Sequence, residues 1–395
     1  MSPEVTAAWI AAGASVVTLI GSGIAQVMGF RSTRANTEQQ IKATHKDTED
    51  TLEQQRQQLD KALAEEREQL NKTLKAQSDQ LDRTLAEQRT RTLNERFATA
   101  AEQLGSDKPP AVRLAGVYAM AGLADDWEEN RQTCVEVLCA YLRMPYERDP
   151  GDEAPQPLRL AFRASHEVRR TVIRVITAHL RDHAAKSWQG LNFDFTGAVF
   201  DGGDFSFAEF SGGEVSFWHA EFSGGEVVLF DRANFSGGEV DFRGARFSGG
   251  EVSFDRANFS GGDVDFSFAE FSGGMVDFSA ATVSGGTVDF TRADFSGGTV
   301  GFRFAEFSGG EVGFIGAGFS GGTVGFNNAT FSGGEVDFTR ANFSGGTVRF
   351  DAANFSGGTV DFTDPGDWSF PPAFPWTDRP PLGVKLPRKE SQSGA

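Results

Sequence analysis

The chain has 395 residues, 39% of them hydrophobic, and a formal net charge of −18 at pH 7. The acidic excess is confined to residues 191–362, where 8 Arg are outnumbered by 24 Asp or Glu, and it argues against nucleic-acid binding through phosphate contacts. Two cysteines, Cys134 and Cys139, are too few for a disulfide framework, so we expect reduced core thiols.

The first predicted element is a transmembrane helix over residues 5–30, which carry no charge. A cleaved signal peptide is the alternative, but its basic start is missing. Basic residues follow directly, which predicts a single-pass protein of the cell membrane with most of its chain in the cytoplasm. Three small residues recur every fourth position and would let a second span pack closely: Gly21, Ala25 and Gly29.

Residues 31–96 repeat with a period of eleven and are predicted to form a coiled-coil stalk. Eleven residues make three helical turns, so the leucine seam stays nearly straight. A seam this narrow cannot bury itself, which predicts a parallel homo-oligomer through the coiled coil. A helix lying flat on a membrane is the alternative, although it would need a broader apolar face. The seam residues are Leu52, Leu59, Leu63, Leu70, Leu74, Leu81 and Leu85.

Residues 97–186 are predicted to form a small helical adaptor, because helix-period apolar residues are interrupted at Gly105 and end at Pro145. An amphipathic helix follows the Pro-rich linker 147–157. His179 and His183 lie four residues apart on this helix and could share a metal ion, but no third ligand is evident. We therefore predict no metal site.

From Phe210 to Phe355 the unit F-S-G-G-x-V-x-F-x-x-A-x recurs every twelve residues, with one extra residue at 228–230 and Val283 in place of one Phe. A fixed short period predicts a solenoid. Residues i and i+2 of an extended segment face the same way, so the Val-Phe and Ala-Phe pairs should point inward. Representative core positions are Phe210, Val215, Phe217, Phe247, Val252, Phe254, Phe331, Val336, Phe338, Ala341 and Phe343.

The chain resembles the pentapeptide-repeat proteins, whose unit is A-[DN]-[LF]-x-x. "ANFSG" at Ala341 and Ala353 fits this unit, and the first phenylalanines of the repeat region are five residues apart. The stretch 95–124 also resembles the helical segment before such repeats in bacterial members. The resemblance implies a right-handed quadrilateral β-helix. Because the period here is twelve rather than ten, one turn would take about 24 residues with four strands or about 12 with two, and we favour 24.

The Gly-Gly pairs admit more than one interpretation. Calcium-binding coils also begin with Gly-Gly, but Val replaces their third Gly and Phe their Asp, so we predict structural corners. Threonines before Val resemble an ice-binding array that Glu residues interrupt. The tail, residues 364–395, is predicted to cap the last coil through Trp368 and Phe370 and then to be disordered. Its prolines are alternatively a ligand for a partner's groove.

The predicted fold is an α+β multi-domain protein: transmembrane helix (5–30), coiled-coil stalk (31–96), helical adaptor (97–186), β-solenoid (187–363), and cap with tail (364–395). The sequence contains no nucleophile–base pair, phosphate loop or metal cluster, so we expect neither an enzyme nor a cofactor. The first hypothesis is a membrane-anchored scaffold for an unknown protein partner, with outward arginines at corners: Arg232, Arg256, Arg292 and Arg340. The resemblance implies an alternative, a DNA-mimicking inhibitor of a topoisomerase such as gyrase.

Overall fold

The computed structural model describes residues 34–105, 107–377 and 379–388, which separate into two compact units with the division between Gln88 and Arg89. Within these residues no helix combines the length and the hydrophobicity needed to cross a bilayer. This finding overturns the predictions of a transmembrane helix and of a single-pass location in the membrane. The stretch 5–30, with the three small residues assigned to helix packing, lies outside the described residues.

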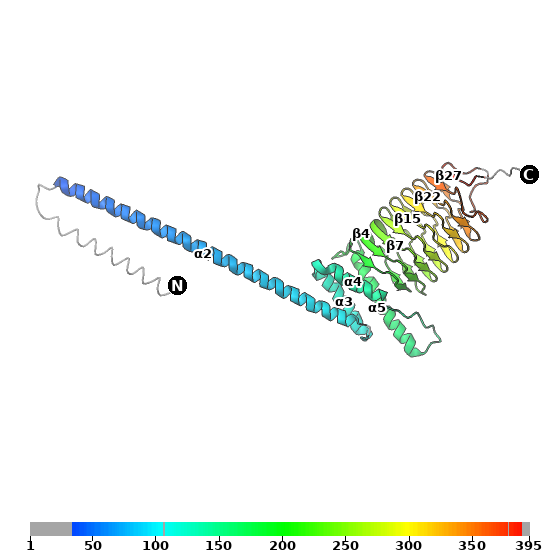
Figure 1. Ribbon diagram of the computed structural model, residues 1–395, viewed down its shortest axis with the longest axis horizontal. Coiled ribbons are helices and arrows are strands. Elements are labelled where there is room, and N and C mark those ends of the chain that lie inside the picture. Colours follow the sequence, from blue (N-terminus) through cyan, green and yellow to red (C-terminus); the bar gives the residue numbers. More distant parts are fainter. Residues whose placement is uncertain (1–33, 106, 378, 389–395) are drawn as a thin grey trace, which may run out of the picture. The chain divides into compact units, whose positions relative to one another are not determined.

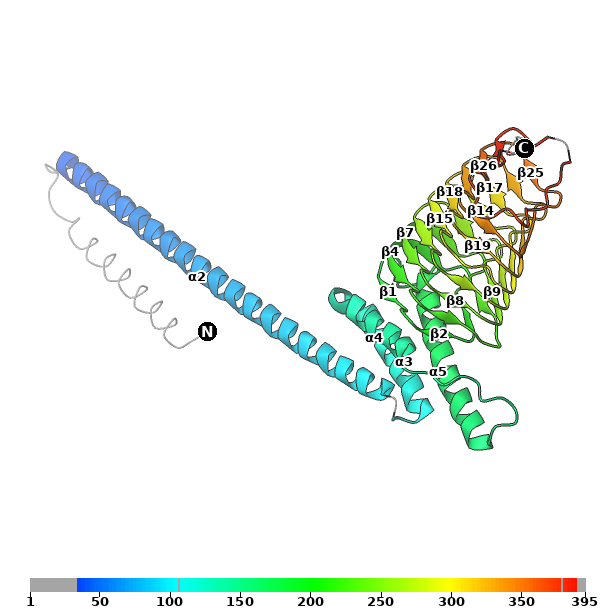
Figure 2. The same ribbon diagram turned by 45° about the vertical axis from the view of Figure 1, so that its right-hand side comes forward.

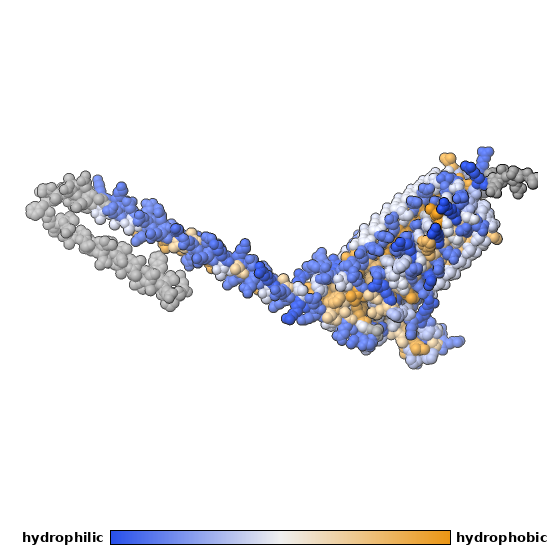
Figure 3. All heavy atoms as spheres, viewed as in Figure 1, coloured by the Kyte–Doolittle hydropathy of each residue, from blue (hydrophilic) through white to orange (hydrophobic). Residues whose placement is uncertain are grey.

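Helix α2 (Arg34–Leu104) occupies the region predicted as a stalk. It is rich in Gln, Glu, Lys and Arg, and its described surface is largely hydrophilic with scattered apolar spots (Figure 3). The seven seam leucines are 44–59% exposed, and no second helix covers them in the part of the chain that the structure describes. The predicted coiled coil is therefore wrong for this structure, because two leucines in eleven bury nothing on their own.

Three further helices pack together beside the first strands: α3 (Pro110–Asp126), α4 (Arg131–Arg143) and α5 (Gln156–Leu180), with a 3₁₀ turn, η1 (Glu128–Asn130), between α3 and α4 (Figure 1). Prolines at the first turns of α3 and α5 favour helix starts there, because proline's missing N–H is not needed at that position. Ile173 of α5 lies against Gly203, so α5 covers the open first turn of the solenoid.

The strands form a parallel solenoid with four faces, which we call A, B, C and D in chain order (Figure 2). Asn258 pairs with Thr282, and Thr282 with Glu306, so one regular turn takes 24 residues. The first turn is shorter, since Phe193 pairs with Val215, and the second is longer, since Glu209 pairs with Asn234. The structure therefore confirms the prediction of 24, rather than 12, residues per turn of the solenoid.

Faces A and B carry most of the outward charge. Face A contains β1 (Phe193–Asp194), the second halves of β4 (Glu209–Ser216) and β7 (Asn234–Asp241), β11 (Asp263–Asp265), β15 (Thr287–Asp289), β18 (Glu311–Gly313), β22 (Glu335–Asp337), β26 (Thr359–Asp361) and β27 (Val384–Lys385). Face B contains β2 (Val199–Phe200), β5 (Glu221–Phe222), β8 (Arg246–Phe247), β12 (Glu270–Phe271), β19 (Gly318–Phe319) and β23 (Asn342–Phe343).

Faces C and D complete each turn. Face C contains β3 (Gly203–Asp204), β6 (Val228–Leu229), β9 (Glu251–Ser253), β13 (Met275–Asp277), β16 (Thr299–Gly301), β20 (Thr323–Gly325) and β24 (Thr347–Arg349). Face D contains the first halves of β4 and β7, β10 (Asn258–Phe259), β14 (Thr282–Val283), β17 (Glu306–Phe307), β21 (Thr330–Phe331) and β25 (Asn354–Phe355). Because β4 and β7 run through the corner, faces A and D form one 14-stranded sheet.

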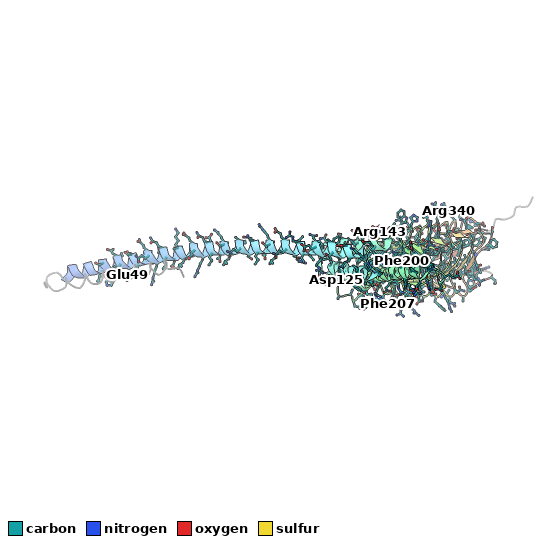
Figure 4. All side chains as sticks on the ribbon, turned by 90° about the horizontal axis from the view of Figure 1, so that it is seen from below. Glu49, Asp125, Arg143, Phe200, Phe207 and Arg340 are labelled. Carbon is teal, nitrogen blue, oxygen red and sulfur yellow. The ribbon has the colours of Figure 1, made fainter. Side chains whose placement is uncertain are left out.

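The interior is filled by columns of stacked phenylalanine rings, one column from each face. Phe266 stacks on Phe242 and on Phe290 with ring centroids 4.6 and 4.9 Å apart, about the spacing of neighbouring strands. Phe200 lies inside the solenoid in Figure 4. The eleven representative core residues named from the sequence are all at most 3% exposed. A parallel solenoid with regularly stacked Phe is consistent with the pentapeptide-repeat resemblance.

The C-terminal segment closes the far end of the solenoid. Trp368 packs edge-on against Phe343, and Trp376 packs edge-on against Phe355. Strand β27 adds to β26 on face A and covers its free backbone groups. Phe370, which the sequence also assigned to the cap, is instead 55% exposed.

Candidate functional site

The short corners between faces A and B and between faces C and D are tight turns with a positive φ at their third residue. In one of them the Ala269 N–H donates to the Phe266 carbonyl at 3.0 Å, while Phe268 adopts φ 61°. An aspartate before the corner accepts a hydrogen bond from the backbone two residues later, as Asp265 does from Ser267 at 2.7 Å. Many of the outward aspartates therefore stabilise the turn in addition to carrying charge.

The Gly-Gly pairs form the other two corners, where successive turns approach backbone to backbone. Gly262 has φ 74°, and a Cβ there would lie 2.7 Å from the Gly238 carbonyl oxygen. Only glycine fits such a corner without displacing the turn below. Among the described residues no group of three or more His, Cys, Asp or Glu could hold a metal ion.

Face A concentrates the acidic charge. The position before each Val forms one outward column, in which Glu239, Asp263, Glu311 and Glu335 are exposed and make no hydrogen bond or salt bridge with described residues. The position after Val forms a second column with the turn-stabilising aspartates: Asp194, Asp241, Asp265, Asp289, Asp337 and Asp361. Neighbouring rungs are about 4.8 Å apart. Face A therefore presents two rows of carboxylates, which are interrupted by Thr287 and Thr359 in the first column and by Ser216 and Gly313 in the second.

Face C holds the same repeat positions but little charge. After Glu251, the column before Val continues with Met275, Thr299, Thr323 and Thr347. The threonines that resembled an ice-binding array are thus split between two faces, because alternate repeats fall on opposite sides. The column after Val on face C contains only Asp204, Asp277 and Arg349 as charged residues. Face C therefore carries far fewer carboxylates than face A.

A groove of about 1050 Å³ lies on face A beside helix α4, over the first turns. Its floor is formed by outward residues of β1, β4 and β7, and one wall is α4. The opposite wall is the corner that follows face A, where Trp218 and Phe268 are 47% and 54% exposed. The Gln132 side chain fixes α4 in place, since it donates to the Asn192 carbonyl at 2.9 Å and accepts from the Asn192 N–H at 3.0 Å.

The charges of the groove are only partly paired. Arg143 of α4 forms a salt bridge with Asp194, and Arg243 binds both oxygens of Asp241 at 2.9 and 2.6 Å. The Asp241 hydrogen bonds raise the pKa of the Arg243 guanidinium further above its ordinary value. Glu214 has no such partner among the described residues, and its carboxylate remains exposed on the floor of the groove.

The helical adaptor meets the solenoid through a small polar network. The His179 ring stacks on the buried Trp188 ring at 3.9 Å, and Asp125 accepts from the Trp188 indole N–H at 3.0 Å and lies 3.3 Å from His179 Nε2. His179 is therefore used in packing, and its contacts in the described part of the chain do not include His183. Asp125, labelled in Figure 4, belongs to the last turn of α3.

A second network holds the linker and α5 against the first turn. The Arg169 guanidinium is buried, donates to the Val199 carbonyl at 2.7 Å and lies 4.3 Å from the Tyr146 ring centroid. The Tyr146 hydroxyl donates to Asp201 at 2.6 Å. Burial and this bond to Asp201 raise the pKa of Tyr146, whereas burial lowers the pKa of Arg169. These groups stabilise the junction and face no cavity.

The two cysteines are buried and unpaired with each other. Burial raises the pKa of the Cys134 thiol to about 11 and that of the Cys139 thiol to about 12. A thiol with such a pKa is protonated and unreactive near neutral pH. They therefore offer no nucleophile.

The four corner arginines named from the sequence lie in two separate columns. Arg232 and Arg256 lie on the C–D corner with Phe207, and Arg292 and Arg340 on the A–B corner with Phe268. In Figure 4 the labelled Phe207 and Arg340 lie at opposite sides of the solenoid. Sequence reasoning missed the groove and the acidic face, although aligning each residue with the one 24 positions later would have shown the acidic columns.

No protein-family model, curated protein or solved structure matches this chain. The resemblance to pentapeptide-repeat proteins therefore has its support in the fold, a parallel β-solenoid with a helical N-terminal region and regularly spaced, stacked phenylalanines.

Proposed function

We propose that this protein is a non-enzymatic scaffold whose solenoid binds a partner protein through face A. The observation that carries the proposal is the segregation of charge: face A bears two interrupted rows of carboxylates, while the opposite face C, with the same repeat, carries far fewer. Solenoids commonly use one extended face for binding. The interior is the same in every turn and does not restrict which residues occupy the outward columns. The acidic residues of the first column are therefore not needed for core packing.

The partner should present a basic surface, because opposite charges steer association and suppress wrong partners. The first column matters most for this purpose. Its carboxylates, unlike the turn-stabilising aspartates, have no internal hydrogen bonds to satisfy, so they are available to a partner at no cost to the fold.

Proximity labelling in cells from a tag on the full chain tests this proposal. The double variant Glu311→Gln/Glu335→Gln removes two free carboxylates from face A, and Glu251→Gln/Glu306→Gln makes the same chemical change on faces C and D. We expect the first variant to lose its labelled protein partners and the second to keep them. Equal partner sets for both variants would refute the role of face A.

An acidic rod that imitates DNA and inhibits a topoisomerase such as gyrase is the second candidate, and the two close rows of carboxylates favour it. Duplex DNA carries one charge per roughly 1.7 Å of axis, and the rungs of face A, about 4.8 Å apart, carry one or two carboxylates each, which is about half that density. A gyrase supercoiling assay with the full chain separates the candidates. A scaffold leaves supercoiling unchanged, whereas a DNA mimic inhibits it and loses inhibition in Glu311→Gln/Glu335→Gln.

A further inference from the structure

We propose that the groove between α4 and the first turns of face A binds an extended, arginine-rich segment of the partner protein. The inference rests on the proposed function, because it names the part of face A that the partner's basic chain enters. The charges of the groove, its aromatic wall and its shape support this inference.

The groove has uncompensated negative charge. Asp194 and Asp241 have their arginine partners, but Glu214 on the floor and Glu136 on α4 have no cation among the described residues. Glu136 accepts only a neutral hydrogen bond, from Gln132 at 3.2 Å. The groove therefore contains two carboxylates, one on α4 and one on the floor, that have no counter-charge among the described residues, and a chain carrying two or more cations complements them.

The aromatic wall is built at a cost in strain. Phe268 holds φ 61°, a region that bulky residues rarely adopt, and its ring is 54% exposed. Gly244 and Gly316 occupy the same corner one turn earlier and two turns later, with φ 63° and 66°. Glycine is thus sufficient for the corner. Apart from the Arg292 guanidinium, 5.7 Å from its centroid, the exposed ring of Phe268 is suited to a contact outside the chain.

The aromatic wall also selects the kind of cation. The Trp218 and His219 rings lie 4.6 Å apart, and Phe268 already has the Arg292 guanidinium 5.7 Å from its ring centroid. Guanidinium groups stack on such rings and bind carboxylates with two parallel hydrogen bonds, whereas the lysine ammonium does neither as well. Arginine is therefore the side chain that can both stack on the aromatic wall and bind the carboxylates of the groove.

The shape favours an extended chain over a small molecule. Typical small-ligand pockets are enclosed and contain few charged groups, whereas this groove is partly open to solvent and has four carboxylates and two arginines among its lining side chains. Its α4 wall is held rigidly by the paired hydrogen bonds between Gln132 and Asn192. A preformed wall lowers the entropy cost of binding a flexible segment.

The test uses fluorescein-labelled octapeptides of alternating Arg and Gly, or Lys and Gly, titrated with the full chain at low salt and followed by fluorescence anisotropy. We expect the Arg peptide to bind about threefold more tightly than the Lys peptide. Glu136→Gln/Glu214→Gln should weaken Arg-peptide binding about fivefold to tenfold. The comparison variant Glu311→Gln/Glu335→Gln removes the same charge from a part of face A that the whole partner contacts but that does not line the groove, so it should weaken octapeptide binding by a clearly smaller factor.

A second matched pair of variants tests the aromatic wall. Phe268→Ala should weaken Arg-peptide binding about threefold to fivefold, while Phe304→Ala, which removes an equally strained and 50% exposed Phe from the C–D corner, should leave it unchanged. Far-ultraviolet circular dichroism confirms that each variant is folded.

Three results would overturn the proposal. Equal losses in the two glutamate variants would mean that peptides bind along face A in general, which leaves the proposed function intact and removes the groove. No Arg-peptide binding by the unaltered chain would exclude a basic segment. A dimer in analytical ultracentrifugation that dissociates in Glu136→Gln/Glu214→Gln would show that a second copy of the chain occupies the groove.

Discussion

Val283 is the one position where a phenylalanine column is interrupted. Replacing it with Phe tests whether a ring at this position stacks as the other rings of the columns do. Val283 lies on face D between Phe259 and Phe307, and a cavity of about 10 Å³ with a wholly apolar lining remains beside it. Elsewhere in the columns, rings stack at 4.6 to 5.5 Å. A ring at position 283 would therefore have a stacking partner both above and below.

The expected gain follows from burial and from the room available. Phe adds four apolar carbons to Val, worth about 3 kcal/mol at roughly 0.8 kcal/mol per buried methylene. The cavity holds only about one water's volume, so the walls must move outward at a cost of about 1 to 2 kcal/mol. We expect Val283→Phe to stabilise the chain by about 1 to 2 kcal/mol, the difference between the two terms.

Thermal unfolding followed by circular dichroism measures this change, and the expected rise in Tm is about 2 to 6 °C. Phe307→Val is the matched control, because it extends the same gap by one turn and should lower stability by about 2 to 4 kcal/mol. A Val283→Phe protein that is less stable than the parent would refute the reasoning. It would mean that the walls have closed around Val283 and that the columns are not uniform there.

Three other predictions concern the corners, the thiols and the cap. Gly262→Ala should destabilise the chain by about 2 to 4 kcal/mol in chemical denaturation, through a positive φ and a backbone clash, while Gly225→Ala, whose Cβ would meet nothing within 4 Å, should change stability little. Cys139 should react with a thiol reagent at pH 8 only as fast as the chain opens, because burial raises its pKa to about 12; rapid reaction of the folded protein would contradict its burial. Burial alone would raise the pKa of Asp361, but hydrogen bonds from Thr363 and Lys385 lower it below the ordinary value. The cap is thus stabilised above the unfolded-state pKa of Asp361, and this contribution should disappear as pH falls through the lower folded-state pKa. The protection factors of the β27 amides, which correct for the intrinsic pH dependence of hydrogen exchange, should fall in that pH range, whereas in Asp361→Asn they should stay constant there.

The solenoid could be predicted from the sequence because the residue pattern that specifies it is local and is repeated many times. Val336 and Phe338 are two residues apart and so point the same way, and the twelve-residue repeat places such a pair at every second face. The tryptophan of the cap was predictable for the same reason: Trp368 follows the last regular unit, where an open edge must be covered.

The surface and the helices were less predictable, because they depend on which residues become neighbours in space. The seam leucines such as Leu63 follow a regular pattern, but a pattern on one helix does not supply the second helix that would cover it. The acidic face emerges only when alternate repeats are assigned to opposite sides. The groove depends in addition on where α4 packs, and no local signal in residues 131–143 specifies that.

Phe268 connects the strain in the fold with the proposed binding, and Phe268→Gly separates the two. A left-handed conformation costs a non-glycine residue about 1 to 2 kcal/mol, while the extra freedom of glycine in the unfolded chain costs about 0.5 to 1 kcal/mol. Because the ring is 54% exposed and little burial is lost, Phe268→Gly should leave stability unchanged or raise it by about 0.5 to 1 kcal/mol, while weakening the Arg peptide as Phe268→Ala does. A loss of stability above about 1 kcal/mol would show instead that the ring is retained for its contact with Arg292 within the chain. The strain would then have a structural explanation and would no longer support a partner.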